Sequence, residues 1–352
     1  MKNFEVWNLA DDRQRYNKCL EKCNPRTVFH LTEYLLAEAE AENGTTVVFY
    51  YEEDGMFALI PEVLRRINDL PYMVELEEEL YDMITPHEYS GIVSNSYDKA
   101  LKNKLLKNIL SYCRKNNIIC QFIRLNPYLA ELPLIYKENG FDVFHSNEQV
   151  YVNLEQTEEN IMKQYRSNVR RNIKRAKREG LTFEIAEKSL FNVNAFQGMY
   201  RKSMDLLGAR NFFYFNNRYF NKLIECDCSK LAFVKEETGK IIAASIMLLD
   251  RNTAYYHLGC SDREYSLKRP MNYLMHSMIL WSRRMGKQIF HLGGGHKSLM
   301  QFKEAYSETR IDYYVASQIC DQKKYLNVCK KWKEQFSEIE DENYYPLYRY
   351  NE

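Results

Sequence analysis

The sequence predicts a mixed α/β protein of the α+β type, built from two copies of one unit in which helices flank a mixed central sheet. Two observations support this fold class. Strand-like apolar runs and helix-like segments follow one another in the same order in both halves of the 352-residue chain. Short segments also match: Phe-Ile-Arg-Leu at 122–125 corresponds to Phe-His-Leu-Gly at 290–293, and Tyr-Lys-Glu at 136–138 to Phe-Lys-Glu at 302–304. Such self-similarity indicates a duplicated unit.

The pattern is clearest in the second half, where short apolar runs separated by turn residues indicate an antiparallel meander. Pro270 begins a helix-like segment after the meander and Gly286 ends it, as proline and glycine commonly do. The expected elements are strands at 231–235, 240–249 and 254–259, a helix at 270–285, a strand at 288–292, a helix at 297–306 and a strand at 311–316.

The first half repeats this order. Asn139 and Gly140 end the second of its helices, because both residues tolerate the left-handed backbone of a helix end. The expected elements are a hairpin of strands at 45–51 and 55–60, a helix at 98–115, a strand at 118–124, a helix at 128–138 and a strand at 141–152.

One helix is expected between the halves, at residues 157–179, with Thr157 capping its start and Gly180 its end. Apolar residues at helical spacing predict one buried face. Basic residues cover the other faces of what we call the basic segment, residues 163–178: Lys163, Arg166, Arg170, Arg171, Lys174, Arg175, Lys177 and Arg178. The expected domains are an N-terminal domain at 1–152, this connecting helix at 153–180, a C-terminal domain at 181–320, and a C-terminal helix and tail at 321–352.

The basic segment has a charge of +8 in a chain whose net charge is only +1. We expect no acidic partners at i+4, so that the helix repels itself unless an anion lies nearby. Two interpretations stay open: an ordinary solvated face, or a surface that binds the phosphates of a partner. The candidate phosphate-binding or RNA-binding residues are Arg166, Arg170, Arg171, Lys174 and Arg175.

Composition excludes several classes of protein. Nine scattered cysteines lack the paired spacing of a zinc site, so we expect reduced thiols and no metal. The longest apolar run, residues 241–249, is too short to cross a bilayer. The N-terminus lacks the apolar core of a secretory signal, and we therefore expect a cytoplasmic protein without a transmembrane segment.

The most informative motif joins a strand to a helix through three glycines, Gly293, Gly294 and Gly295, with Phe302 and Lys303 following on the helix. Glycines let backbone N–H groups approach a bound group closely, and a lysine one turn on can add a positive charge. These features favour stabilisation of an oxyanion in acyl transfer. The alternatives are that Lys303 is a surface lysine like Lys137 in the first copy, and that Phe302 belongs to the core.

Further candidates lie around this motif. His257 and His291 occupy strands that should be neighbours, where either could accept the proton of an amine, although a structural role is the alternative. In the first half, Tyr89 and Gly91 could border an acceptor site or form a turn. Arg124 ends a buried strand, where it needs an anionic partner, either a substrate phosphate or an internal carboxylate. No arrangement indicates a covalent intermediate, so we expect direct attack by the acceptor.

Several segments, taken in order, resemble the FemABX family of peptidoglycan-bridge aminoacyltransferases, which have two domains of the GNAT acetyltransferase fold. The resemblance spans roughly residues 30–317. The segments are Thr-Pro-His-Glu-Tyr-Ser-Gly at 85–91, the basic segment through Gly180, Tyr-Tyr-His-Leu-Gly at 255–259, Asn272 with the helix around Trp281, His-Leu-Gly-Gly-Gly at 291–295, and Phe-Lys-Glu-Ala-Tyr-Ser at 302–307.

The resemblance implies two tandem GNAT-like domains and transfer of an amino acid from aminoacyl-tRNA to an amine of a peptidoglycan precursor, in a bacterial cell-wall pathway. It places Lys303 at the reaction centre and adds Tyr200, Tyr256 and Asn272 near the substrate. No tightly bound cofactor is implied. Related proteins use acyl-CoA and modify amino sugars or polysaccharides, but the chain lacks a clear Gln/Arg-x-x-Gly-x-Gly/Ala pyrophosphate loop. Peripheral membrane contact is considered for the enzyme alongside its donor and precursor. A non-catalytic protein that binds anionic lipid or nucleic acid is the third reading.

Overall fold

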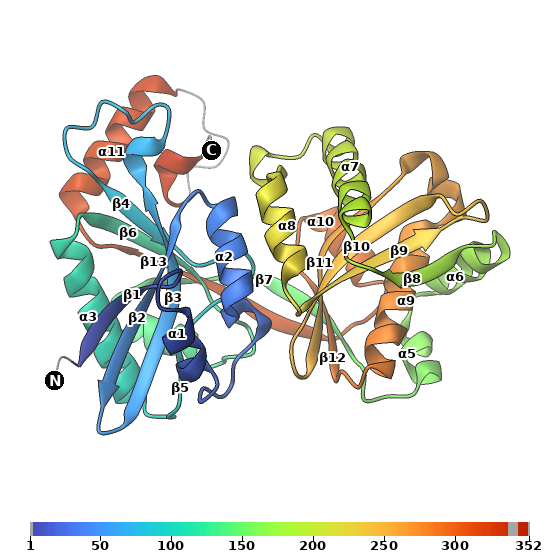
Figure 1. The fold of residues 1–352 in the computed structure, drawn as a ribbon, viewed down its shortest axis with the longest axis horizontal. Helices are drawn as coiled ribbons and strands as arrows, with labels where there is room; N and C mark the ends of the chain where they lie inside the picture. The colour runs from blue at the N-terminus through green and yellow to red at the C-terminus, as the bar shows by residue number, and fades with distance from the viewer. Residues whose placement is uncertain (1–2, 337–343, 351–352) are drawn as a thin grey trace. The chain divides into compact units, whose positions relative to one another are not determined.

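The computed structural model describes residues 3–336 and 344–350, which form two compact units (Figure 1). The first unit contains residues Met1–Ser146 and Tyr313–Glu352, and the second contains Asn147–Asp312. The chain leaves the first unit within strand β7 (Asp142–Asn153) and returns to it within strand β13 (Arg310–Ile319).

The sheet of the first unit has the strand order β1-β2-β3-β4-β6-β13, with β5 paired to β3. All of its neighbouring strands are antiparallel except β4 and β6, which are parallel. The strands before the chain crosses to the second unit are β1 (Phe4–Asn8), β2 (Thr45–Glu53), β3 (Met56–Arg66), β4 (Tyr81–Ile84), β5 (Val93–Ser94) and β6 (Ile118–Arg124).

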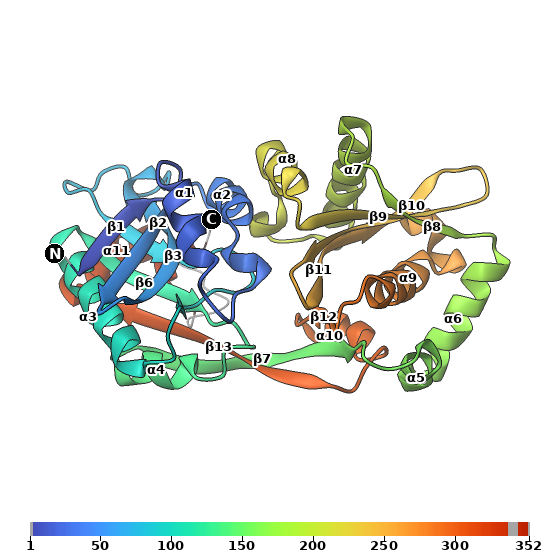
Figure 2. The same ribbon diagram turned by 60° about the horizontal axis from the view of Figure 1, so that its bottom comes forward.

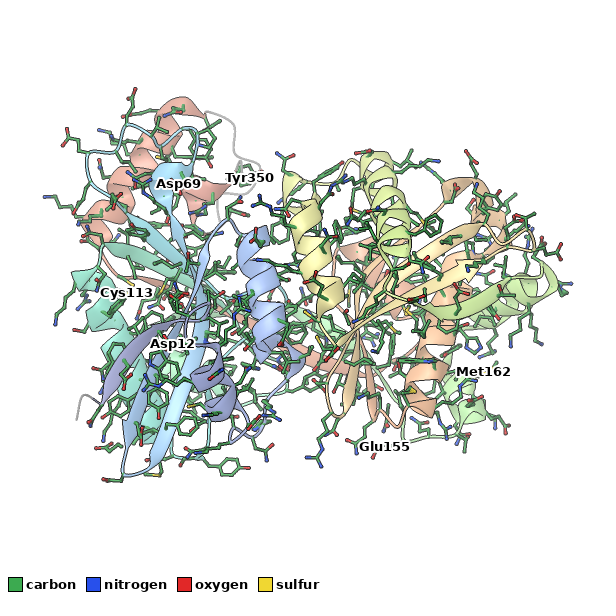
Figure 3. All side chains as sticks on the ribbon, viewed as in Figure 1. Asp12, Asp69, Cys113, Glu155, Met162 and Tyr350 are labelled. Carbon is green, nitrogen blue, oxygen red and sulfur yellow. The ribbon has the colours of Figure 1, made fainter. Side chains whose placement is uncertain are left out.

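Helices cover both faces of this sheet because side chains alternate along each strand. On β2, Phe49 and Tyr51 pack towards α3 (Lys99–Lys115) and α4 (Leu132–Glu138). Val48 and Tyr50 belong to the cluster of α1 (Arg13–Leu20) and α2 (Thr32–Ala41). Figure 3 labels Cys113, which α3 buries in the first of these clusters.

The C-terminal helix α11 (Gln322–Gln335) packs on the first unit together with the short turn η5 (Leu347–Arg349). Trp332 and Tyr348 are fully buried there, against Ile119 and Cys120 of β6. The predicted helix in this tail is therefore present, and parts of the predicted tail, residues 337–343 and 351–352, lie outside the described residues.

The sheet of the second unit has the order β7-β12-β11-β10-β9-β8. Its strands β8 (Thr182–Ala186), β9 (Ser229–Lys235), β10 (Ile241–Leu249) and β11 (Thr253–Ser261) form an antiparallel meander. Strand β12 (Ile289–Gly293) then runs parallel to β11 and antiparallel to β7. The sequence predicted the strands of this meander at 231–235, 240–249 and 254–259 and the strand at 288–292. Among these five strands, only β8 was not predicted.

Helix α9 (Pro270–Arg284) packs against one face of this sheet, and α7 (Leu190–Leu207) and α8 (Asn217–Glu225) lie on the other (Figure 2). Helix α10 (Lys297–Lys303) follows β12 directly. The mixed sheets with flanking helices confirm the predicted fold class. The expected helices and strands of both halves are present with shifts of a few residues at their ends.

The single helix predicted at 157–179 is wrong. The structure has two helices, α5 (Glu158–Gln164) and α6 (Ser167–Arg178), separated by extended backbone at Tyr165 and Arg166. Burial explains the break: the Tyr165 ring packs edge-on against Tyr306 at 5.2 Å, and the Arg166 amide donates to the carbonyl of Ala305 at 2.8 Å. These tertiary contacts outweigh the continuous helical pattern of the sequence.

The units also divide the chain differently from the domains expected from the sequence. Residues 313–320, assigned there to the C-terminal domain, group with the first unit. The physical reason is that β13 pairs antiparallel with β6, with Val315 opposite Arg124 and Ile319 opposite Cys120. The local sequence of β13 shows that it is a strand, but it does not show that its partner is a strand of the first copy.

Candidate active site

The candidate site forms where β11 and β12 separate. The two parallel strands are paired over only three positions, ending where Tyr255 lies opposite His291. Strand β11 continues to Ser261, and β12 ends at Gly293. Beyond the paired part, the edge of β11 that faces β12 has no strand partner in the described structure.

The glycine turn at the end of β12 is packed tightly. Gly293 and Gly295 have positive φ angles of 76° and 141°, which favour glycine. At Gly294, a Cβ atom would lie 2.6 Å from Nε2 of Gln149 and 2.8 Å from Oδ1 of Asn147. The turn therefore needs glycine at 293 and 295 for their backbone angles, whereas the middle position is crowded only by the ends of two side chains.

Lys303 is the last residue of α10 and is buried, with an exposed fraction of 5%. Its Nζ donates to the carbonyl oxygen of Gly294 at 2.5 Å. The equivalent residue of the first copy, Lys137 near the end of α4, is exposed. The reading of Lys303 as a surface lysine is therefore wrong, because this ammonium is held inside the second unit beside the glycine turn.

Tyr256 lies next to this ammonium, with Nζ of Lys303 5.7 Å from the centre of its ring. Its hydroxyl lies against Gly259: a Cβ atom on Gly259 would be only 2.1 Å from it. Burial, with a smaller effect from Cys260, raises the pKa of Tyr256 well above its ordinary value. The phenol therefore stays protonated at neutral pH and presents a donor beside the unpaired part of β11.

Asn272 links three elements around the site. Its Nδ2 donates to the hydroxyl of Tyr306 at 2.9 Å, and its Oδ1 accepts from Nδ2 of Asn172 on α6 at 3.1 Å. Burial raises the pKa of Tyr306, although the bond from Asn272 opposes this shift. Tyr306, three residues after Lys303, was not singled out from the sequence, and its position within the Phe-Lys-Glu-Ala-Tyr segment was the only signal for it.

Phe302 is half-buried in the core of the second unit and lies edge-on to Tyr306 at 5.4 Å. It packs in the apolar cluster that α9 covers, with Met300 and Leu292. This placement agrees with the alternative that Phe302 is a core residue.

The two histidines do not point towards Lys303. His257 bonds through Nε2 to the hydroxyl of Tyr219 on α8, at 2.8 Å. His291 is buried and alternates along β12 with Phe290 and Leu292, which face the α9 cluster, so its ring lies on the opposite face, 5.5 Å from Tyr255. The structure brings Lys303, Tyr256 and the glycines together and leaves both histidines elsewhere.

Tyr200 also lies in an aromatic core, between α7 and α8. Its ring is 5.8 Å from Phe196, 5.6 Å from Phe220 and 6.3 Å from Phe215. Burial is the main cause that raises its pKa, and a smaller effect from Tyr256 indicates that the two phenols are within electrostatic range.

In the first unit, Tyr89 and Gly91 serve packing. The Tyr89 ring is buried edge-on against Phe29 at 5.1 Å and against Tyr313 at 5.4 Å. Gly91 has a φ angle of 148°, and a Cβ atom there would lie 2.3 Å from Leu132. Its carbonyl also lies 3.3 Å from Nε2 of buried His30.

Arg124, also in the first unit, contacts a backbone carbonyl and an aromatic ring. Its Nη1 donates to the carbonyl of Thr85 at 2.9 Å, and its guanidinium lies 5.5 Å from the Phe122 ring centre. No carboxylate within the described residues forms an ion pair with it. Tyr313 is close enough for Arg124 to lower its pKa, although burial raises that pKa overall. The side chain is half-buried and keeps donors for an anion.

The basic segment is only partly compensated. Arg166 pairs with Glu304 at 3.6 Å, Arg175 with Glu179 at 3.8 Å, and Arg170 bonds to backbone carbonyls. The expectation that no acidic residue pairs at i+4 was wrong for Arg175, because Glu179 lies just beyond the segment, and for Lys163, which pairs with Glu159 at 2.8 Å. Four cations on α6 are exposed and have no carboxylate partner among the described residues: Arg171, Lys174, Lys177 and Arg178.

The fold, together with a match to a domain family, defines an acyltransferase. Residues 163–304 match the model of the acetyltransferase (GNAT) domain family, a range that includes the basic segment, the separating strands and Lys303. The second unit therefore carries a GNAT domain, and such a domain implies an activated acyl donor and an amine acceptor. No curated protein matches the chain in sequence.

Solved structures extend the similarity to both units. The structure of FemX has a TM-score of 0.67 at 14% identity, covering 92% of this chain and 99% of that one. The C-terminal domain of a putative lysylphosphatidylglycerol synthetase from Agrobacterium fabrum has a TM-score of 0.59 at 17% identity, covering 88% and 92%. A tandem GNAT protein from the clavulanic acid biosynthesis pathway has 0.52 at 8%, covering 90% and 98%.

These identities are low, so the likeness is one of fold, and the chain has a FemX-like tandem GNAT fold. The resemblance seen in the sequence is confirmed at this level. No helix in the described part of the chain is both long and apolar enough to span a membrane.

Proposed function

We propose that the protein transfers an aminoacyl or acyl group from an activated ester or thioester to an amine of a cell-envelope precursor. The observation that carries this proposal is the burial of Lys303 against the Gly294 carbonyl, beside the unpaired edge of β11. The bond to the Gly294 carbonyl holds the ammonium beside the glycine turn. A positive charge held in a buried position is well placed to stabilise a negative charge that develops on a substrate.

In this proposal the acyl carbonyl lies between Lys303 and the separated part of β11. The acceptor amine attacks the carbonyl carbon directly, and the tetrahedral intermediate carries its negative charge on the former carbonyl oxygen. The ammonium of Lys303 stabilises that oxyanion electrostatically, since a preorganised donor in a water-poor site is most effective where charge develops. When the intermediate collapses, the bond to the leaving oxygen or sulfur breaks and a new amide remains.

The proton of the attacking amine ends on the leaving group. Tyr256 is the neighbouring group that can assist this transfer, because its phenol is protonated at neutral pH and its hydroxyl lies at Gly259 on the unpaired strand. His257 and His291 have no part in this scheme, because their rings are directed to α8 and to the far face of the sheet.

For the acceptor, we propose that Arg124 binds an anionic group such as the phosphate of a nucleotide-linked or lipid-linked precursor. The support is its half-buried guanidinium without an ion-pair partner in the described structure. An arginine fork suits phosphate and carboxylate geometry. A peptidoglycan precursor fits this chemistry, as does another envelope amine that carries a phosphate.

Two donors remain, and the basic segment favours aminoacyl-tRNA. Arg171, Lys174, Lys177 and Arg178 present an unpaired cationic surface on α6. Asn172 on the same helix connects through Asn272 to Tyr306, near Lys303. One neighbour in fold is named as a putative lysylphosphatidylglycerol synthetase, and a lysyl group is an aminoacyl group. Acyl-CoA is the second candidate, because the matched family is named for acetyl transfer.

The test incubates purified protein with charged tRNA or acyl-CoA and a panel of amine-bearing envelope precursors, and reads the acceptor's mass. Lys303→Met should lower kcat by about 10²–10³ with the productive donor. Lys137→Met, at the equivalent exposed position of the first copy, is the matched control and should leave kcat unchanged. The proposal fails if no donor is consumed, or if the two variants behave alike.

The same experiment separates the donors. With tRNA, binding should weaken as salt rises, with a slope of about 0.7–0.9 per phosphate contact, and Lys174→Gln together with Arg178→Gln should flatten that slope. With acyl-CoA, thioester consumption should proceed without RNA. If neutralising the basic segment abolishes cellular function while Lys303→Met does not, the protein is a non-catalytic binder of nucleic acid or anionic lipid.

A further inference from the structure

One surface segment of the second unit exposes far more apolar area than its neighbours. Residues 206–214 include the end of α7 and the short turn η3 (Asn211–Phe213). Five large apolar or aromatic side chains are exposed within these nine residues, with Leu207 71% and Phe213 40% exposed: Leu206, Leu207, Phe212, Phe213 and Tyr214. We call these five side chains the apolar cap. Exposed apolar residues normally occur singly, so a cluster of this kind indicates a binding surface.

Cations flank the apolar cap in the sequence. Between positions 201 and 218 the sequence has four basic residues, Arg201, Lys202, Arg210 and Arg218, and a single acidic residue, Asp205. All five charged side chains are exposed. The segment therefore combines exposed apolar side chains with a net charge of +3. This combination is complementary to a partner that has an anionic surface over an apolar interior.

Several backbone amides of the cap are bonded within the segment. Gly208 ends α7 in the left-handed conformation, and its amide donates to the carbonyl of Asp205 at 3.2 Å, while Ala209 donates to Met204 at 3.1 Å. In the following turn, Phe213 donates to Arg210 at 3.0 Å and Tyr214 to Asn211 at 2.8 Å. These internal bonds matter because unsatisfied backbone groups are what makes a loop costly to bury in lipid.

We infer that the apolar cap docks on the surface of an anionic lipid bilayer. Aromatic and aliphatic side chains beside arginines suit the boundary between headgroups and acyl chains. A second protein is a poorer occupant, since a stable protein interface takes about 20–30 residues from each side and this cap has five side chains. The inference does not depend on the proposed function, because it concerns adsorption to lipid and no chemical step.

The test measures binding of the full chain to vesicles by flotation, without substrates. The wild-type protein should bind vesicles of phosphatidylcholine mixed with an equal amount of phosphatidylglycerol, and bind phosphatidylcholine alone much more weakly. Leu207→Glu combined with Phe213→Glu should lower the partition coefficient at least about tenfold. Arg210→Gln combined with Arg218→Gln should reduce the preference for the anionic lipid.

The chain offers a matched control at the other end of α7. Leu190 and Phe191 are 68% and 78% exposed, comparable to the cap residues, but they lie outside the cationic segment. Leu190→Glu combined with Phe191→Glu should therefore leave vesicle binding unchanged. Circular dichroism of the cap variant and of this control variant checks that each is folded.

Three results would overturn the inference. The first is absence of wild-type binding to anionic vesicles, or equal loss in the cap and control variants. The second is a concentration-dependent dimer that the cap variant disrupts, which would assign the surface to a second copy. The third is a cap variant, Leu207→Glu combined with Phe213→Glu, that binds vesicles like the wild type but has a raised KM for a water-soluble acceptor, which would make the cap part of the substrate site. Loss of transferase activity alone would leave the lipid measurement unaffected.

Discussion

Two consecutive arginines on β3 provide a sharp test of how burial controls the contribution of an ion pair. Arg65 bonds to Glu42 at 2.7 Å and to Asp82 at 2.9 Å. Arg66 bonds to Asp69 at 3.0 Å and to Glu79 at 2.6 Å. Each arginine has two carboxylate partners at similar distances, but the side chain of Arg65 is 6% exposed and that of Arg66 is 41% exposed.

The perturbation is Arg65→Met, compared with Arg66→Met. Removing the Arg65 guanidinium leaves the carboxylates of Glu42 and Asp82 buried with fewer partners, and breaking a buried pair in this way costs about 3–5 kcal/mol. Asp82 retains Arg349 at 2.5 Å and the hydroxyl of Tyr348 at 2.9 Å, which places the expected loss near the lower end of that range. Arg66 lies in water, where solvent screens its pairs, so its removal should leave stability unchanged within error.

Tryptophan fluorescence can follow the first unit alone. Trp7 and Trp332 are buried in this unit, and Trp281 is the remaining tryptophan, in the second unit. In a Trp281→Phe background, urea unfolding monitored by fluorescence therefore reports the first unit. A loss of about 3 kcal/mol shifts the midpoint by roughly 1–3 M urea. Equal midpoints for the two variants would refute the argument that burial decides the contribution.

Three further predictions follow from buried groups. Burial raises the pKa of Glu62 to about 8 from its ordinary 4.5, so the carboxyl is protonated in the folded protein at neutral pH. The free energy of unfolding should fall as pH rises from about 4.5 to 8, because the carboxyl ionises at lower pH in the unfolded chain than in the folded one. Urea titrations at several pH values should show a smaller fall for Glu62→Gln. Gly295→Ala forces an alanine into a φ angle of 141°, which residues with a side chain rarely adopt, and should displace the neighbouring Gly294 carbonyl that holds Lys303, lowering kcat about tenfold to a hundredfold, whereas Gly198→Ala, with open space around it, should not. Asn272→Leu leaves the buried Tyr306 hydroxyl without its 2.9 Å donor and should cost about 1–3 kcal/mol in thermal unfolding, with less additional loss when Tyr306→Phe is also present.

Local patterns in the sequence predicted most strands and helices because they record which side chains each element buries. The hairpin of β2 and β3 and the meander of β9, β10 and β11 follow apolar runs bounded by turn residues. The glycine turn was predictable for the same reason, since few other sequences permit its backbone angles. Lys303 was identified from its distance along the chain to this turn, and α10 then brings it back to the Gly294 carbonyl.

Features that depend on distant contacts were not predictable in this way. The break at Tyr165 exists because Tyr306 packs against it, although the two residues are far apart in sequence. The pairing of β13 with β6 joins the two copies' strands, and nothing in either strand encodes its partner. The sequence correctly placed His257 and His291 on neighbouring strands, but it does not show which groups their side chains contact, such as the Tyr219 hydroxyl that bonds to His257.

The two copies of the fold differ at the point where chemistry is proposed, and the difference explains why only one carries it. In the first unit, the parallel strands β4 and β6 stay connected beyond their paired residues, because the Ser90 amide donates to the Arg124 carbonyl at 2.8 Å and the Asn126 amide donates to the Ser90 carbonyl at 2.7 Å. In the second unit, pairing of β11 and β12 stops at Tyr255 and His291. Asn126 and Pro127 occupy the first copy where the second has its glycines. The open strand edge, the glycine turn and the buried lysine occur together in the second unit, whereas the first copy has closed strands and an exposed Lys137. This co-occurrence is our reason for proposing the oxyanion site in the second unit, and the half-buried Arg124 is our reason for proposing that the first copy binds an anion.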